Sequence, residues 1–225
     1  MQPWPSVWPR ELSRVAAVVP HPDDEVFVAG LLHRAHRGGA HVTLICATRG
    51  ERGWLFGKPA TAEKVAPLRS QELARSCTAI GVNELVHLDL GDGLVAADKN
   101  AIGGAIEAAA PDLVVSYDID GGYGHRDHIA VAEAVAACGR RWLRLAFPDG
   151  LWRAFGRKLA RVYPELITES NQPADAIAWE LELTDDGARA KRAAAAAHAS
   201  QLSAAGAFLF ADLEAEIFSR ELYRE

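Results

Sequence analysis

Short apolar runs alternate with helical patterns along most of the chain. Runs rich in β-branched residues predict buried strands at 15–19, 42–47, 85–88, 113–117 and 142–147. Between them, apolar residues at helical spacing predict helices at 26–37, 65–80, 96–109 and 127–137. Gly81 follows the second of these helices, at the position where glycine commonly ends a helix. This alternation predicts an α/β fold: a Rossmann-like, doubly wound, mostly parallel sheet with helices on both faces.

The pattern changes after Pro148. A helical pattern covers 151–162, a strand-like alternation covers 176–183, and an alanine-rich helix is expected at 185–202 with Thr184 as its N-cap. No linker composition separates this part from the rest of the chain. We therefore expect residues 1–225 to form a single domain, with the part from about 148 decorating the sheet.

Composition and charge narrow the class of protein. Hydrophobic residues make up 49% and charged residues 24% of the chain, as in ordinary globular proteins. A net charge of −6 without a basic cluster argues against nucleic acid and anionic membranes as partners. Cys46, Cys77 and Cys138 lie in apolar sequence and predict free buried thiols. With no signal pattern or membrane-length apolar run, we expect a soluble cytoplasmic protein with a small-molecule substrate. The sequence is compatible with a monomer and with a homo-oligomer.

The first chemical motif is P-H-P-D-D-E at 20–25, directly after the first predicted strand. Doubly wound folds bind ligands outside the carboxyl ends of their strands. His21 and Asp24 are three residues apart, and an imidazole with a carboxylate is a common pair of ligands for a divalent metal of the zinc type. Asp23 is then left free. An acidic helix N-terminus would also account for the acids, but it does not account for His21.

The second motif is G-G-Y-G-H-R-D-H at 121–128, directly after the fourth predicted strand. Its glycines allow the backbone to approach a ligand closely. His125 and His128 alone would be typical of a helix surface, but the first motif changes this interpretation. His21, Asp24 and one of these two histidines would give three protein ligands and leave a fourth position for water, as in catalytic zinc sites.

Together, H-P-D-D-E and G-G-Y-G-H-R-D-H resemble the motifs of the LmbE-like, or PIG-L, deacetylases, which remove an acetyl group from N-acetylglucosamine conjugates. The glycine-tyrosine loop is most similar to that of the mycothiol-pathway deacetylase, although Pro20 and Arg126 depart from the commoner Ala and Pro. Weaker matches extend the resemblance along the chain: T-R-G-E at 48–51, Arg69 with Glu72, His87-Leu88 leading to Asp92-Gly93, and Lys191 with His198, Ser200 and Gln201.

The resemblance implies a metal site and a base. His21, Asp24 and His128 would hold Zn²⁺, and Fe²⁺ also suits these ligands. Asp23 would be the general base that takes a proton from metal-activated water. These roles agree with the interpretation of the spacing given above.

Further roles implied by the resemblance concern the developing oxyanion and the sugar. Tyr123 or a protonated His125 would stabilise the oxyanion, and Asp127 would orient His125 and raise its pKa. Either His125 or protonated Asp23 would protonate the departing amine, and the sequence leaves this choice open. Two further residues, Arg69 and Asp92, match positions that contact sugar hydroxyls in relatives.

The leading hypothesis is a metal-dependent deacetylase of an N-acetylglucosamine-type conjugate. The same site would also serve another small N-acyl amine or a glycosylated natural product. A metal- or sugar-binding module without turnover is a different class, and such a module has no need of Asp23. A nucleotide-binding enzyme is excluded, because H-P-D-D-E in place of G-x-G-x-x-G would set carboxylates against a pyrophosphate.

Overall fold

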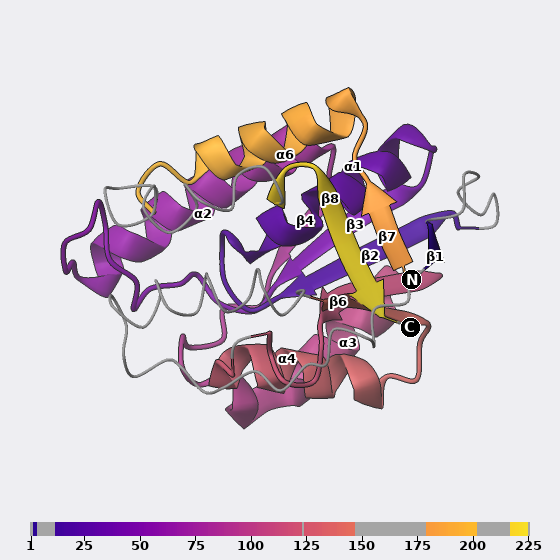
Figure 1. Ribbon diagram of the computed structural model, residues 1–225. Helices are drawn as coiled ribbons and strands as arrows, with labels where there is room; N and C mark the ends of the chain where they lie inside the picture. The colour runs from indigo at the N-terminus through magenta and orange to yellow at the C-terminus, as the bar shows by residue number, and fades with distance from the viewer. Residues whose placement is uncertain (1, 4–11, 123, 147–178, 202–216, 225) are drawn as a thin grey trace.

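The computed structural model describes residues 2–3, 12–122, 124–146, 179–201 and 217–224. Within these ranges, eight strands form one sheet in the order β1-β7-β8-β6-β5-β2-β3-β4 (Figure 1). The strands are β1 Gln2–Pro3, β2 Arg14–Val19, β3 His41–Cys46, β4 Glu84–His87, β5 Leu113–Tyr117, β6 Trp142–Ala146, β7 Trp179–Glu182 and β8 Arg220–Arg224. Strands β2 to β6 are parallel, and β8 runs antiparallel to both of its neighbours. The predicted fold class is confirmed.

The order of the parallel strands positions a binding site. From β2 the chain adds β3 and β4 on one side, and then crosses to add β5 and β6 on the other side. In doubly wound sheets the crevice at this reversal, outside the carboxyl ends of the strands, is where ligands bind. Strands β2 and β5 are direct neighbours, with Ala17 opposite Val115. The two motifs follow these two strands, so they meet at the reversal.

Helices cover both faces of the sheet (Figure 1). One layer holds α1 Ala29–Arg37, α2 Ala62–Ile80 and α6 Asp185–Ala197, with α6 packed on both α1 and α2. The other layer holds α3 Lys99–Ala109 and α4 Arg126–Ala137. Alternate residues of β2 pack against the two helix layers. Val19 lies in the apolar cluster with α1, and Val18 lies in the cluster with α3 and α4.

Several predicted boundaries change in the structure. The helix expected at 26–37 begins as a 3-10 helix, η1 Asp24–Val28, and the helix expected at 96–109 begins as η2 Val95–Asp98. The alanine-rich helix ends at Ala197 and not at 202, because side chains and amides of the next residues bind carboxylates elsewhere in the fold. Strand β8 was not predicted, since its buried polar residues hide the alternation. The helix expected at 151–162 lies outside the described residues.

Other predictions hold. The Thr184 side chain accepts a hydrogen bond from the backbone of Gly187, which confirms the N-cap, and Gly81 ends α2 in the left-handed conformation with φ of 91°. The cysteines are free thiols, although Cys138 is only half-buried, and burial raises the pKa of Cys77 to about 12. Within the described ranges, no helix has the length and hydrophobicity needed to cross a membrane.

Candidate active site

Asp24 lies between two imidazoles. Its Oδ2 accepts a hydrogen bond from the backbone of His21 at 2.9 Å, which closes the turn after β2. The same oxygen lies 3.3 Å from His21 Nδ1 and 3.5 Å from His128 Nε2. Two ligand atoms bound to one tetrahedral zinc ion are about 3.4 Å apart, given bond lengths near 2.1 Å. Each of these two distances therefore fits a pair of ligands that share one divalent cation.

The start of α4 brings two more histidines to the same point. His125 is the N-cap of α4, and His128 lies in its first turn. The ring centroids of His125 and His128 lie 5.0 and 5.3 Å from that of His21, and the three residues offer nitrogens within 4.8 Å of one another. Gly121 has φ of 69°, and a Cβ there would lie 2.9 Å from the Cβ of His128. The glycine thus permits the close approach of the loop to the helix.

Asp127 contacts His21 through its carboxylate. Asp127 Oδ2 lies 3.2 Å from His21 Nε2 and also accepts from the backbone of Gly93 at 2.6 Å. Asp92 Oδ1 lies 3.4 Å from the same His21 nitrogen, so His21, Asp92 and Asp127 form a second group of potential ligands. Histidines that bind a metal through one nitrogen usually donate to a carboxylate through the other. Asp127 is placed to orient His21 in this way.

His125 is linked to Asp127 through the main chain. The backbone N–H of Asp127 donates to His125 Nδ1 at 3.2 Å, so Nδ1 accepts and the ring proton of the neutral imidazole is assigned to Nε2. Burial and the charge of His21 lower the pKa of His125, and the charge of Asp127 only partly opposes them. The pKa increase expected from Asp127 alone is thus outweighed.

The electrostatics of the cluster favour a cation. Burial raises the pKa of Asp24, but the charges of His128 and His21 outweigh it and hold that pKa well below its usual range. Burial lowers the pKa of His128 to about 3. Burial also lowers the pKa of His21, but Asp127 and Asp24 raise it well above its usual value, so positive charge is favoured at this point. Ionised Asp24 and neutral His128 are in the forms that bind metals, and a metal would replace the proton that His21 otherwise favours.

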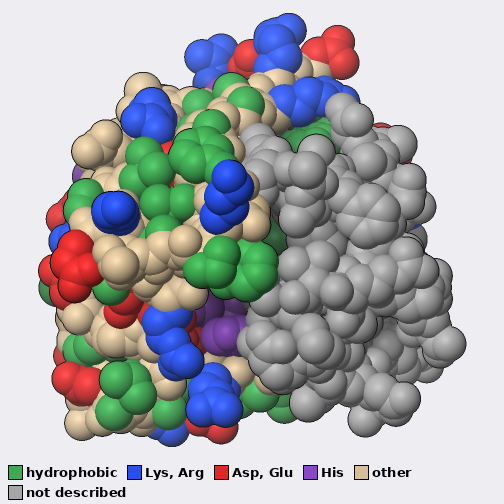
Figure 2. Space-filling model, turned by 90° about the vertical axis from the view of Figure 1, so that its left-hand side faces the viewer, with side chains coloured by type: hydrophobic (Ala, Val, Ile, Leu, Met, Phe, Trp, Pro, Cys, Tyr) green, Lys and Arg blue, Asp and Glu red, His purple; other side chains and the backbone are tan. Residues whose placement is uncertain are grey.

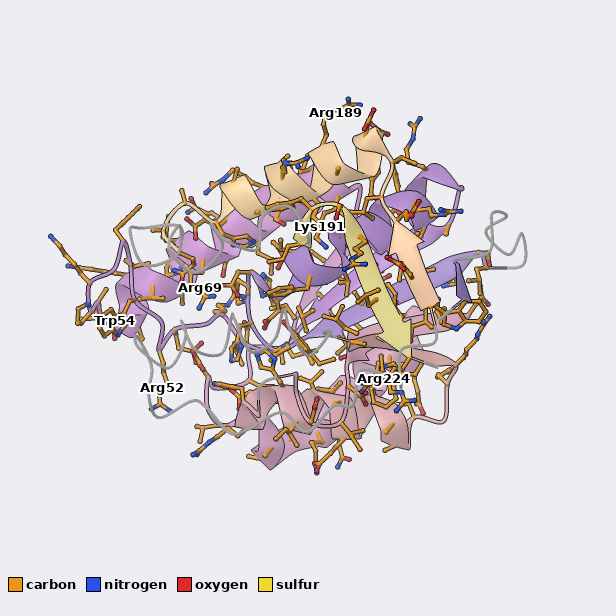
Figure 3. The ribbon with its side chains drawn as sticks, viewed as in Figure 1. Arg52, Trp54, Arg69, Arg189, Lys191 and Arg224 are labelled. Carbon is orange, nitrogen blue, oxygen red and sulfur yellow. The ribbon has the colours of Figure 1, made fainter. Side chains whose placement is uncertain are left out.

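Asp23 is held apart from the two imidazoles that face Asp24. Its side chain is 38% exposed, and Arg69 Nη2 donates to its Oδ2 at 2.8 Å. Arg69 reaches inward from α2 (Figure 3), where it also donates to the carbonyls of Pro22 and Gly50. Burial raises the pKa of Asp23 to about 6, although Arg69 opposes the increase. The contact of Arg69 with a sugar remains a prediction.

Sequence analysis assigned no role to several polar residues around this cluster. The Tyr117 hydroxyl donates to Asp24 Oδ1 at 2.8 Å, and its position as the last residue of β5 was the available signal. Glu25, in the first motif, and His198, among the weaker matches, form a buried pair beside Asp23. The sequence assigned neither of them a role, because their contact depends on how α6 packs. Tyr123, a predicted oxyanion partner, lies outside the described residues.

The site reaches the surface at the carboxyl edge of the sheet. Figure 2 shows histidine side chains in a hollow flanked by basic and hydrophobic side chains. Loops at the same edge carry exposed hydrophobic residues, with Trp54 and Phe56 after β3, Leu94 after β4 and Ile119 after β5.

Fold and site together define a candidate metal centre at the reversal of a doubly wound sheet, with a half-exposed carboxylate beside it. Imidazole and carboxylate groups gathered in this way are the donors that divalent metals bind in proteins. The family model described as "PIG-L: GlcNAc-PI de-N-acetylase" matches residues 16–138, more than half of the chain. The chain therefore belongs to this family, and the resemblance noted in its motifs is confirmed.

Curated relatives agree with this assignment, and a solved structure shares the fold. The chain is 32% identical to the 1D-myo-inositol 2-acetamido-2-deoxy-alpha-D-glucopyranoside deacetylase of Nakamurella multipartita, over 84% of this chain and 80% of the relative. It is 31% identical to the deacetylase of the same name from Corynebacterium glutamicum, over 84% of this chain and 75% of the relative. The N,N'-diacetylchitobiose deacetylase from Pyrococcus horikoshii has the same fold, with a TM-score of 0.68 at 17% identity, covering 96% of this chain and 84% of that one.

Proposed function

We propose that this chain is a metal-dependent hydrolase that removes the acetyl group from an N-acetylglucosamine-type conjugate. The observation that carries the proposal is the spacing around Asp24 Oδ2, which lies 3.3 Å from His21 Nδ1 and 3.5 Å from His128 Nε2. Imidazole nitrogen and carboxylate oxygen are donors that suit Zn²⁺, and also Fe²⁺. The family and the relatives, which are named deacetylases of an acetylated glucosaminyl inositol, support the reaction and the substrate class.

A divalent metal held by His21, Asp24 and His128 would lower the pKa of water and polarise the acetamide carbonyl. Asp23 takes a proton from the attacking water as the new C–O bond forms, and Arg69 holds its carboxylate during this step. The C–N bond then breaks to leave acetate, and the proton held by Asp23 passes to the amine nitrogen.

His125 and Asp127 have supporting roles in this proposal. With Nδ1 accepting from the backbone of Asp127, His125 carries its proton on Nε2 and donates it as a hydrogen bond to the developing oxyanion. Asp127 orients both His21, through its carboxylate, and His125, through its amide. Tyr123 adds a hydroxyl donor from the same loop, as the sequence predicts.

In this proposal, the sugar of the substrate binds to residues at the rim of the cluster. Asp92, whose side chain is 12% exposed, lies 3.4 Å from His21 Nε2 and accepts from the backbone of Arg52. Its carboxylate, with Arg69, would bind sugar hydroxyls next to the acetamide. A carboxylate so close to the metal ligands would align the amide carbon with the attacking water.

The direct test is amine release by the purified chain loaded with Zn²⁺ or Fe²⁺. Substrates would be an N-acetylglucosaminyl inositol, N,N'-diacetylchitobiose and, as a control outside the class, an N-acetylated lysine peptide. We expect equal amounts of acetate and free amine from an amino-sugar conjugate, loss of the reaction with a chelator and recovery with the metal. Release from the peptide alone would contradict the substrate class, and activity that survives full removal of the metal would contradict the mechanism.

A further inference from the structure

Glu25 is fully buried next to Asp23 and has three partners. Its Oε2 accepts from the backbone of Asp23 at 2.9 Å, and its Oε1 accepts from Ser76 Oγ at 2.5 Å. The same Oε1 lies 2.6 Å from Nε2 of His198, which is 2% exposed. A carboxylate away from water requires such partners. Well-packed apolar side chains often stabilise a fold as much as a buried ion pair does. Stability alone therefore does not explain why Glu25 and His198 form a buried pair here.

Asp23 has an unusual backbone. Its φ is 101°, in the left-handed region that a residue with a side chain seldom adopts. Glu25 holds the backbone N–H of Asp23, while Arg69 holds its carboxylate. The bond to Glu25 is therefore one of the contacts that keep Asp23 in this conformation, and its loss would favour a change in the backbone and in the direction of the carboxylate.

His198 is fixed by the turn that follows α6. The backbone N–H and the hydroxyl of Ser200 donate to the carboxylate of Glu72 in α2, at 2.7 and 2.6 Å. Gln201 Nε2 donates to the carbonyl of Trp54 at 2.9 Å. The turn is therefore bound to α2 and to the loop after β3, and it holds His198 against Glu25.

We propose that Glu25 and His198 are positioning residues for Asp23, setting its backbone and through it the direction of its carboxylate. This inference rests on the proposed function, in which Asp23 accepts the proton from water. It also gives a role to His198 and Ser200, which the sequence analysis found among the weaker matches to the family. Neither residue of the pair touches the substrate.

The test replaces His198 and measures kcat, KM, metal content and thermal midpoint. In His198→Ala, we expect kcat to fall about 10- to 100-fold, the usual cost of misplacing a catalytic group by about 1 Å. KM and metal content should stay as in the parent, because no ligand or substrate contact changes. His198→Gln places an amide N–H near the position of Nε2 and should recover most of kcat. If His198→Ala does not fold, the same measurements are made on Glu25→Gln, which keeps the shape of the carboxylate.

The matched control is Lys191, on the same helix. Lys191 is 1% exposed, and its ammonium pairs with Glu221 at 2.6 Å, on the side of α6 that faces β8 (Figure 3). Lys191→Met should lower the thermal midpoint without changing the kcat of the folded enzyme. If His198→Ala behaves in the same way as Lys191→Met, the pair is merely structural and the inference is wrong.

Two further measurements separate this inference from the proposed function. A crystal structure of His198→Ala should show Asp23 outside the left-handed region or its carboxylate away from Arg69, and an unchanged Asp23 would overturn the inference. Asp23→Asn is assayed in parallel. If Asp23→Asn lowers kcat and the His198 variants do not, only the positioning role fails; if Asp23→Asn keeps full kcat, the proposed base itself is wrong.

Discussion

Helix α6 takes part in two buried ion pairs that have different purposes. Near its middle, Lys191 pairs with Glu221, whose carboxylate also accepts the backbone N–H groups of Gly30 and Leu31 at 2.8 and 2.9 Å. Just after its end, His198 pairs with Glu25, whose carboxylate accepts the backbone N–H of Asp23. In both pairs, a buried carboxylate bound to α6 holds backbone amides of the segment that follows β2.

The difference lies in the backbone that each carboxylate holds. Gly30 and Leu31 belong to the first turn of α1, where the N-cap residue Val28 provides no side-chain hydrogen bond, so Glu221 satisfies amides that any helix leaves open. Asp23 is in a strained conformation next to the proposed metal ligands. The same chemistry therefore stabilises an ordinary helix start in one region and an unfavourable active-site geometry in the other. Variants of the two regions should separate stability from catalysis.

The largest effect is expected from the metal ligands themselves. His128→Ala removes one of three predicted ligands, so metal should be lost and amine release should fall to the uncatalysed background. Metal analysis and activity of the same preparation check this. Full metal content in the variant would instead point to His125 or Asp127 as ligands, because each belongs to a group of potential ligands that contains His21.

A large effect on stability is expected at Glu221. Glu221→Ala leaves the charge of Lys191 buried and unpaired, which should cost about 3 to 5 kcal/mol in the free energy of unfolding. Urea unfolding measures the loss, and the kcat of the folded fraction should not change. The exposed pair of Arg189 with Asp186 is the control, since Arg189→Ala should cost about 1 kcal/mol at most.

A smaller effect is expected for Tyr117, which orients a ligand. Tyr117→Phe removes the hydroxyl that donates to Asp24 Oδ1 at 2.8 Å and keeps the ring. Loss of a partner of this kind usually weakens metal binding by about 10- to 100-fold. Competition with a chelator of known affinity measures the change, and an unchanged affinity would show that Asp24 needs no support from β5.

The smallest effect is expected at the start of α6. Thr184→Ala removes the side-chain acceptor for the backbone of Gly187 and should lower the free energy of unfolding by about 1 kcal/mol. The kcat should stay the same, because His198 is anchored through Ser200 and Gln201 at the other end of the helix. A lower kcat would mean that the start of α6 is coupled to the active site.

The sequence was sufficient to predict the parallel part of the sheet and the strand ends at which the two motifs meet. Buried parallel strands are continuous apolar runs, so 15–19 and 113–117 were readable, and motifs at strand ends fix a location in a doubly wound fold. Antiparallel β8 was missed because Glu221 and Arg224, both polar, are buried by pairing with other charged residues. The hydrophobic pattern of a sequence does not identify a charged residue that is buried together with its partner.

The supporting residues of the site could not be predicted for a related reason. His198 follows an alanine-rich helix, and nothing near it in the chain indicates a partner 173 residues away. The inward position of Arg69, on Asp23 and two carbonyls, likewise depends on how α2 packs over the loop that contains Gly50. Motif spacing predicts which side chains meet at strand ends, whereas the contacts that hold them come from tertiary packing.

The central claim is that Asp23 is the base and not a ligand. The most direct test is the kcat of Asp23→Asn at full metal occupancy, because the amide keeps the shape of the side chain but cannot take a proton from water. We predict that kcat falls by about 10² to 10⁴-fold, the usual contribution of general-base catalysis. An unchanged kcat in the metal-loaded variant would contradict the account.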